Sequence, residues 1–206
     1  MTTDPIEKTA RIISGVFNPL LLPTYGIAAA MSWSVLQYIP LRTRIEAGSI
    51  IFILTAVIPF MLIYGLATTK IVKDVTLSDR TDRTIPYGAT LLLYIVTAGY
   101  LFMARAPHWL AGFMVGASVA LAITLIVNRW WKISAHAAGT GGLIAMACVI
   151  AILPTTPQPA MWLVITTIMI TGLTCTSRLI LRCHTPAQIY AGVANGMINV
   201  FIWSLI

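Results

Sequence analysis

The chain has 206 residues, of which 58% are hydrophobic and only 9% are charged, and its formal net charge is +7. A soluble domain carries about 25% charged residues, so this composition excludes a water-soluble globular protein. The basic residues lie in short gaps between apolar stretches and form no wettable patch with interleaved aromatic residues. Nucleic acid is therefore not an expected partner either.

Seven apolar stretches follow one another along the chain. A helix needs roughly 20 apolar residues to cross a bilayer core of about 30 Å. The stretches that meet this length are 14–39, 46–68, 86–104, 109–127, 137–154, 159–176 and 186–206. They predict an all-α, polytopic transmembrane helical bundle. It forms a single domain over residues 1–206, without a linker or an extramembrane module.

The first stretch contains two prolines, Pro19 and Pro23. Each proline removes a helical hydrogen bond and clashes with the preceding turn. We therefore expect a kinked or partly re-entrant first segment, and six to seven spans in total. The charged residues between Asp4 and Arg11 argue against a cleaved signal peptide.

Small residues inside the later stretches indicate close helix packing. Gly112 with Gly116, and Gly192 with Gly196, have the spacing that lets two helix backbones approach. The chain has three cysteines, an odd number, and their spacing is not that of metal ligands. We therefore interpret them as packing residues and not as disulfides or metal ligands. They are Cys148, Cys175 and Cys183.

Alternating spans sort the connections onto two sides of the membrane. The N-terminus shares one side with the gaps 69–85, 128–136 and 177–185, and this side holds ten of the thirteen basic residues. The positive-inside rule makes it the cytoplasmic side. A re-entrant first segment would leave these gaps together, because an even number of spans separates each pair.

Three segments on that side, 73–80, 134–136 and 177–188, hold side chains of the kinds needed to bind and cleave a phosphate ester. Lys and Arg side chains hold a doubly negative phosphate, and amides at a helix N-terminus assist them. A neutral imidazole can attack phosphorus while a protonated one donates to the leaving oxygen. The candidate residues are Lys73, Arg80, Ser134, His136, Arg178 and His184.

The spacings of these residues resemble a known set of motifs. K-x6-R, S-x-H and S-R-x5-H, in this order, are similar to the three signature motifs of the type 2 phosphatidic acid phosphatase superfamily. Its members are membrane lipid-phosphate phosphatases related to vanadium haloperoxidases. The resemblance implies that His184 is the nucleophile and His136 the general acid, without a metal or other cofactor. It implies that phosphate is bound by Lys73, Arg80, Ser134 and Arg178.

This sequence departs from the family pattern at several positions. The family motifs read K-x6-R-P, P-S-G-H and S-R-x5-H-x3-D. Thr81 replaces the proline of the first motif, and Ile133 and Ala135 replace the proline and glycine of the second. Gln188 replaces the aspartate of the third motif, one helical turn after His184. An amide oxygen can orient the imidazole but cannot stabilise its charge as a carboxylate does, so we expect weaker activation.

Two other functions are compatible with the sequence. Asp74, Asp79 and Asp82 resemble one aspartate-rich loop of membrane aromatic prenyltransferases, which bind Mg²⁺ and a prenyl diphosphate. No Asp or Glu follows Asp82, so a second such loop is impossible. A basic face could instead bind anionic lipid headgroups without turnover, and Gln188 favours this alternative.

The sequence therefore predicts an integral, multi-pass membrane phosphatase that acts on the phosphomonoester or diphosphate of a lipid. The expected location is the cytoplasmic membrane of a bacterium, and membrane lipids are expected partners. Many family members resemble one another in facing away from the cytoplasm, so the side of the site stays open. The sequence does not identify the particular lipid or the oligomeric state. It also leaves open whether the phosphoryl group is transferred to water or to another acceptor.

Overall fold

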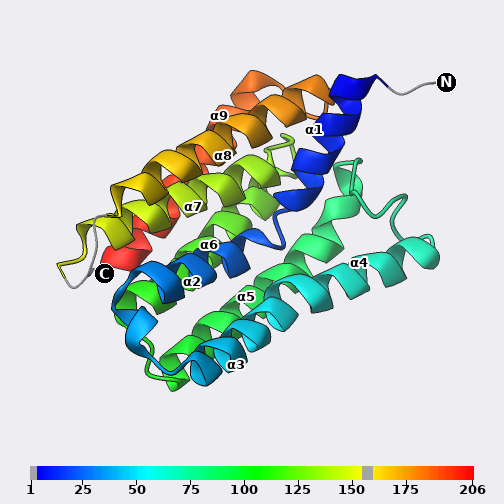
Figure 1. Cartoon of the computed structure of the whole chain (residues 1–206). Helices are drawn as coiled ribbons and strands as arrows, with labels where there is room; N and C mark the ends of the chain where they lie inside the picture. The colour runs from blue at the N-terminus through cyan, green and yellow to red at the C-terminus, as the bar shows by residue number, and fades with distance from the viewer. Residues whose placement is uncertain (1–3, 155–159) are drawn as a thin grey trace.

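The computed structural model of the chain describes residues 4–154 and 160–206. Every regular element in these two ranges is a helix, as predicted. The helices run back and forth in one elongated bundle (Figure 1).

The predicted first stretch, 14–39, is broken into separate elements. Helix α1 (Pro5–Val16) ends before Asn18, and α2 (Leu22–Trp33) carries Pro23 in its first turn. Asn18 Oδ1 accepts the backbone N–H of Leu20 at 3.0 Å, which stabilises the turn between the two helices. A short 3₁₀ helix, η1 (Val35–Tyr38), follows α2. The structure therefore has a full break where a kinked or partly re-entrant segment was predicted.

The second hydrophobic helix is longer than the stretch that predicted it. Helix α3 (Leu41–Phe52), the π-helical segment η2 (Ile53–Val57) and α4 (Ile58–Thr68) are continuous. The π segment ends two residues before Pro59, whose ring disfavours a regular turn at this place. Thr55 in this segment is fully buried and contacts Thr24 of α2 through a 3.2 Å hydroxyl pair.

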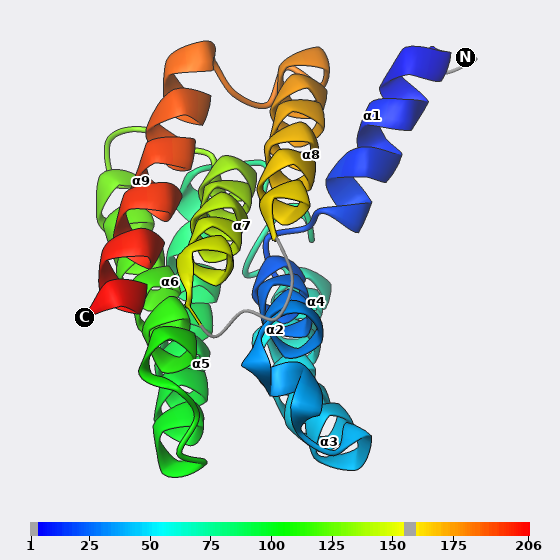
Figure 2. The same cartoon turned by 60° about the vertical axis from the view of Figure 1, so that its left-hand side comes forward.

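The remaining five helices pack antiparallel with short connections. They are α5 (Thr84–Met103), preceded by the 3₁₀ turn η3 (Thr81–Arg83), α6 (His108–Val127), α7 (Ala135–Ile152), α8 (Met161–Ile180) and α9 (Pro186–Leu205). Because successive helices reverse direction, the connections 69–80, 128–134 and 181–185 lie at one end of the bundle. This end is uppermost in Figure 2.

Within residues 4–154 and 160–206, five helices are long and apolar enough to cross a membrane. They are Leu41–Thr68, Thr81–Met103, His108–Val127, Ala135–Ile152 and Met161–Ile180. Helix α9 is equally long but more polar, since it carries Asn195 and Asn199. Asn195 Nδ2 donates to Ala120 O at 2.9 Å and Thr124 Oγ1 at 3.1 Å, so α6 satisfies this amide inside the bundle. The prediction of six to seven spans is not confirmed.

Glycines let α9 pack directly against the backbones of its neighbours. A Cβ on Gly192 would lie 2.6 Å from Ser134 O, and one on Gly196 would overlap Ala138 O, both in or next to α7. Gly112 and Gly116 allow the same approach of α6 to the backbone of α9. The predicted role of these glycines in packing is confirmed. It fixes the N-terminus of α9 against that of α7.

Candidate functional site

The backbone of residues 132–134 connects three of the segments at this end of the bundle. The carbonyl oxygen of Lys132 is 3.2 Å from His184 Nδ1. The carbonyl oxygen of Ile133 accepts from Arg83 Nη1 at 3.5 Å, and the N–H of Ser134 donates to Gln188 O at 3.2 Å. Three consecutive residues before α7 therefore contact the start of α5, the α8–α9 connection and the first turn of α9.

His184 is buried in the connection between α8 and α9. A left-handed residue, Arg182 (φ 51°), follows the end of α8, and the N–H of Cys183 donates back to Arg178 O at 3.1 Å. This turn reverses the chain. Thr185 and Gln188 then form a capping box at the start of α9.

The hydrogen bonds of His184 identify its tautomer. Gln188 Oε1 accepts the N–H of Thr185 at 3.1 Å, so the amide presents its oxygen to this region. The same oxygen is 3.3 Å from His184 Nδ1, which also faces the carbonyl oxygen of Lys132. Since both neighbours can only accept, Nδ1 carries the proton. The second nitrogen, Nε2, has no hydrogen-bond partner among the described residues and keeps its lone pair.

Burial, together with the positive charges of Arg83, Arg178 and Lys132, lowers the pKa of His184 to about 4. The ordinary pKa of an imidazole is about 6.5. His184 is therefore neutral at physiological pH, as a nitrogen nucleophile must be. Burial also lowers the pKa of Lys132, again with contributions from Arg83 and Arg178.

The cations around His184 have no carboxylate partners. Arg83 is only 4% exposed, and its guanidinium donates to two carbonyls, those of Leu77 (2.9 Å) and Ile133 (3.5 Å). It also lies 5.9 Å from the ring centroid of Tyr87. Arg178 has a buried Nε without a hydrogen-bond partner. The ion pairs in residues 4–154 and 160–206 involve neither arginine. Partly buried guanidinium groups without a carboxylate partner favour the binding of an anion.

His136 is linked to this cluster through α1. It is the second residue of α7, and its Nε2 lies 3.2 Å from the carbonyl oxygen of Ser14, so Nε2 is the donor. Arg178 Nη1 donates to the hydroxyl of the same serine at 3.4 Å. One residue of α1 therefore contacts a candidate general acid and a candidate phosphate ligand.

Ser134 is fully buried and caps α7. Its hydroxyl oxygen accepts the N–H of Ala137 at 3.3 Å. This contact uses the oxygen as an acceptor and leaves the hydroxyl proton available as a donor. Ser134 thus fixes the start of the helix that carries His136.

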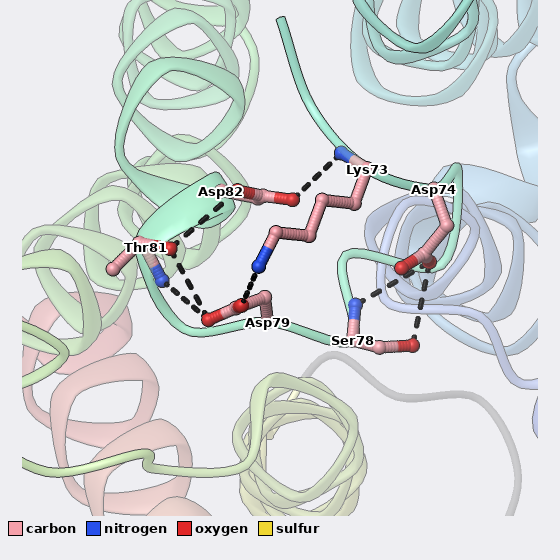
Figure 3. A network of polar contacts seen from close by, with 6 residues as sticks. All are labelled: Lys73, Asp74, Ser78, Asp79, Thr81 and Asp82. Carbon is pink, nitrogen blue, oxygen red and sulfur yellow. Dashed lines mark hydrogen bonds and ion pairs between the residues drawn. The ribbon is translucent and has the colours of Figure 1, made fainter. Parts of the chain in front are cut away.

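Lys73 and Arg80 do not contact the buried imidazoles. Lys73 Nζ forms a 2.5 Å ion pair with Asp79, and its backbone N–H donates to Asp82 at 2.7 Å (Figure 3). Arg80 Nη1 donates to the carbonyls of Asn128, at 3.2 Å, and Arg129. Arg80 therefore satisfies carbonyl groups at the C-terminal end of α6.

Asp74, Asp79 and Asp82 accept hydrogen bonds from residues of the 69–80 connection and so stabilise its shape. The hydrogen bond and charge of Lys73 lower the pKa of Asp79 to about 2, and the same pair raises the pKa of Lys73. Asp74 accepts from the backbone and hydroxyl groups of Thr76 and Ser78. Across the described ranges, no three His, Cys, Asp or Glu side chains gather as around a metal ion.

An open pocket of about 750 Å³ lies outside the buried cluster. Three basic residues line it, together with Trp130, Trp131, Gln188 and the polar residues of the 69–80 connection. These basic residues are Lys73, Arg80 and Lys132. The candidate residues therefore form two layers. His136, Arg178 and His184 are inside, and Lys73 and Arg80 are outside.

Arg83, Lys132 and Ser14 were not among the site residues predicted from the sequence. Arg83 follows Arg80 by three residues, so the short turn η3 decides which arginine faces inward. No sequence pattern indicated that α1 docks beside the site. The three cysteines are free.

Comparisons with protein-family models, curated proteins and solved structures found no match to this chain.

Proposed function

We propose that the protein is an integral membrane phosphatase that hydrolyses a lipid phosphomonoester or diphosphate through a phosphohistidine at His184. The observation that carries the proposal is the pairing of a neutral imidazole with cations that lack carboxylate partners. A substrate phosphate would supply the missing negative charge and place phosphorus beside a nitrogen lone pair. The apolar surface of the helices would hold the lipid tail in the bilayer.

In the first chemical step, the Nε2 lone pair of His184 attacks phosphorus. The bond between phosphorus and the lipid oxygen breaks, and the leaving oxygen takes a proton from His136, whose charged form the negative phosphate of the bound substrate would stabilise. The products are a lipid alcohol and a phosphohistidine; a diphosphate would release a lipid monophosphate instead. Gln188 and the Lys132 carbonyl hold Nδ1–H throughout and keep the ring oriented.

In the second step, water attacks phosphorus and gives a proton to the now neutral His136. The P–N bond breaks, inorganic phosphate leaves, and both histidines return to their starting states. Arg83 and Arg178 would bind the phosphate oxygens during both steps. Lys73, Arg80 and Lys132 would attract the headgroup into the outer pocket.

Phosphate release from purified protein in detergent tests this proposal. A panel of phosphatidic acid, phosphatidylglycerol phosphate and a polyprenyl diphosphate should include at least one substrate, with release unaffected by chelator. His184→Ala should abolish release, whereas His108→Ala should not, because His108 begins α6 at the opposite end of the bundle. Release that persists in His184→Ala would defeat the proposal.

Binding without turnover is the second candidate, and the same unpaired cations favour it. A protein of this kind would bind vesicles containing phosphatidic acid but release no phosphate from any member of the panel. For either function, we propose that the protein lies in the cytoplasmic membrane of a bacterium. We also propose that α9 and the α1–α2 pair cross the bilayer, which would give six to seven spans.

A further inference from the structure

Ser14 occupies an unusual position at the end of α1. The carbonyls of its neighbours Ile13 and Gly15 accept the backbone N–H groups of Phe17 and Asn18. The carbonyl of Ser14 instead accepts Nε2–H of His136 at 3.2 Å. Carbonyls in the last turn of a helix lack helical partners, so an imidazole from another helix can satisfy one of them.

This hydrogen bond assigns roles to the two nitrogens of His136. Since a carbonyl only accepts, Nε2 keeps its proton whether the ring is neutral or charged. The proton that His136 gives and takes must then be the one on Nδ1, which has no hydrogen-bond partner in the described part of the chain. The carbonyl of Ser14 orients this ring as the carbonyl of Lys132 orients the ring of His184.

The register of α1 on α8 sets the position of that carbonyl. The two buried residues of α1 are Ala10 and Ser14, one turn apart, and α1 packs against α8. Other apolar residues of α1, such as Ile12 at 57% exposure, point away from the protein. A larger side chain at position 10 would therefore displace the helix and carry the Ser14 carbonyl away from His136.

We propose that α1 is a positioning element of the active site, in which the Ser14 carbonyl orients His136 for proton transfer and the Ser14 hydroxyl orients Arg178. This inference rests on the proposed phosphatase function and adds to it a helix that the three motifs do not include. Ser14 touches no reacting atom. It acts through His136 and Arg178.

The choice of leaving group distinguishes loss of the general acid from general damage. A lipid alkoxide leaves only with a proton, whereas p-nitrophenolate leaves readily without one. Displacing α1 with Ala10→Leu should lower kcat for the lipid monophosphate by about 10²-fold, the contribution typical of a general acid. The burst of p-nitrophenolate from p-nitrophenyl phosphate, which reports the first step alone, should keep most of its rate in the same variant, because this leaving group needs no proton.

Two further variants separate the carbonyl from the hydroxyl. Ser14→Ala keeps the carbonyl and should raise KM severalfold with little change in kcat, while Ser14→Thr should restore KM. Ile12→Ala, an exposed position on the same helix, is the matched control and should behave like the parent. Ala10→Val makes a smaller displacement and replaces Ala10→Leu if the latter does not fold.

Equal losses on both substrates, or unchanged kcat for the lipid phosphate in a variant whose α1 is displaced, would overturn the positioning role. The displacement itself is checked by the reactivity of a cysteine introduced at Ser14 toward a water-soluble maleimide, in a background without the native cysteines. Phosphate release that survives His184→Ala would defeat the phosphatase function itself, whatever the α1 variants do.

Discussion

The side-chain oxygen of Gln188 lies 3.3 Å from Nδ1 of His184 and 3.1 Å from the backbone nitrogen of Thr185. A backbone N–H only donates, so this oxygen accepts from both groups, and the imidazole tautomer follows. Gln188 therefore supplies the orientation that an aspartate would supply, without its negative charge. Orientation and charge stabilisation can be separated experimentally at this one position.

Gln188→Glu places a carboxylate at the same reach and retains the capping box with Thr185. The carboxylate should stabilise the positive charge that develops on His184 during attack, so kcat should rise severalfold. Gln188→Leu keeps the volume but removes the acceptor, and kcat should fall by about tenfold or more. Steady-state phosphate release by the two variants makes the comparison. A glutamate variant slower than the parent would show that charge on this ring is not limiting.

The lowered pKa of His184 predicts the pH dependence of the reaction. Burial and the charges of Arg83, Arg178 and Lys132 bring this pKa to about 4, so the ring stays neutral as pH falls from 7 to 5. Above pH 5 the rate should not depend on the protonation of His184. Below about pH 4 it should fall tenfold per pH unit, because the protonated ring has no lone pair for attack. Lys132→Gln removes one positive charge but keeps the carbonyl, and should move this acid limb to higher pH. NMR titration of labelled histidine, assigned with His184→Ala, measures the pKa directly.

The same pKa shift links protonation to folding. An unfolded chain binds a proton at His184 near pH 6.5, whereas the folded chain does not until about pH 4. Between these values the unfolded state holds more protons, so the contribution of this group to stability increases with pH. Acidification from pH 6.5 to pH 4 should therefore lower the free energy of unfolding, and His184→Ala should reduce that dependence.

Arg83 and Arg80 provide a matched pair of substitutions. The charge of Arg83 acts on His184, whereas Arg80 donates to carbonyls at the end of α6. Arg83→Lys should lower kcat/KM by about 10²-fold, which corresponds to roughly 2.7 kcal/mol of transition-state stabilisation. Arg80→Lys should change kcat/KM by only a few fold. Kinetics with one lipid phosphate suffice, and a larger loss for Arg80→Lys would reverse the assignment of inner and outer cations.

The sequence predicted the features that depend on local patterns. Long apolar runs predicted helices. Pro19 with Pro23 predicted a kinked or partly re-entrant first segment, and at this place the structure has a break between α1 and α2. Alternating directions placed the segments containing His136 and His184 on one side, and the structure has both at one end of the bundle. These inferences need only helix length, proline geometry and the parity of crossings.

The remaining features depend on tertiary contacts that the sequence does not encode in a readable pattern. The turn η3 directs Arg83, and not Arg80, toward the buried cluster. Lys73 forms an ion pair with Asp79 outside this cluster. The contact of Ser14 with His136 joins residues 122 positions apart. The length of the hydrophobic helix around η2 was also underestimated, because Arg42 and Arg44 in its first turns obscured the start at Leu41.

Close packing of α9 on the residues that begin α7 supplies the last prediction. A methyl group added at Gly192 would meet the carbonyl oxygen of Ser134 at 2.6 Å, and neither backbone can move cheaply. Gly192→Ala should lower stability by about 1–3 kcal/mol. It should also reduce activity more than stability alone explains, because the 3.2 Å bond from Ser134 to Gln188 would lengthen.

Gly172→Ala is the control for the glycine substitution, since nothing lies within 4 Å of a Cβ added there in α8. Alanine favours a helix by up to about 1 kcal/mol over glycine, so this variant should unfold at the parental temperature or above it. Thermal unfolding in detergent and phosphate release, measured on both variants, separate the effects. Parental stability and activity in Gly192→Ala would mean that α9 can move away from Ser134 at no cost. The contact between α7 and α9 would then not be what holds Gln188 against His184.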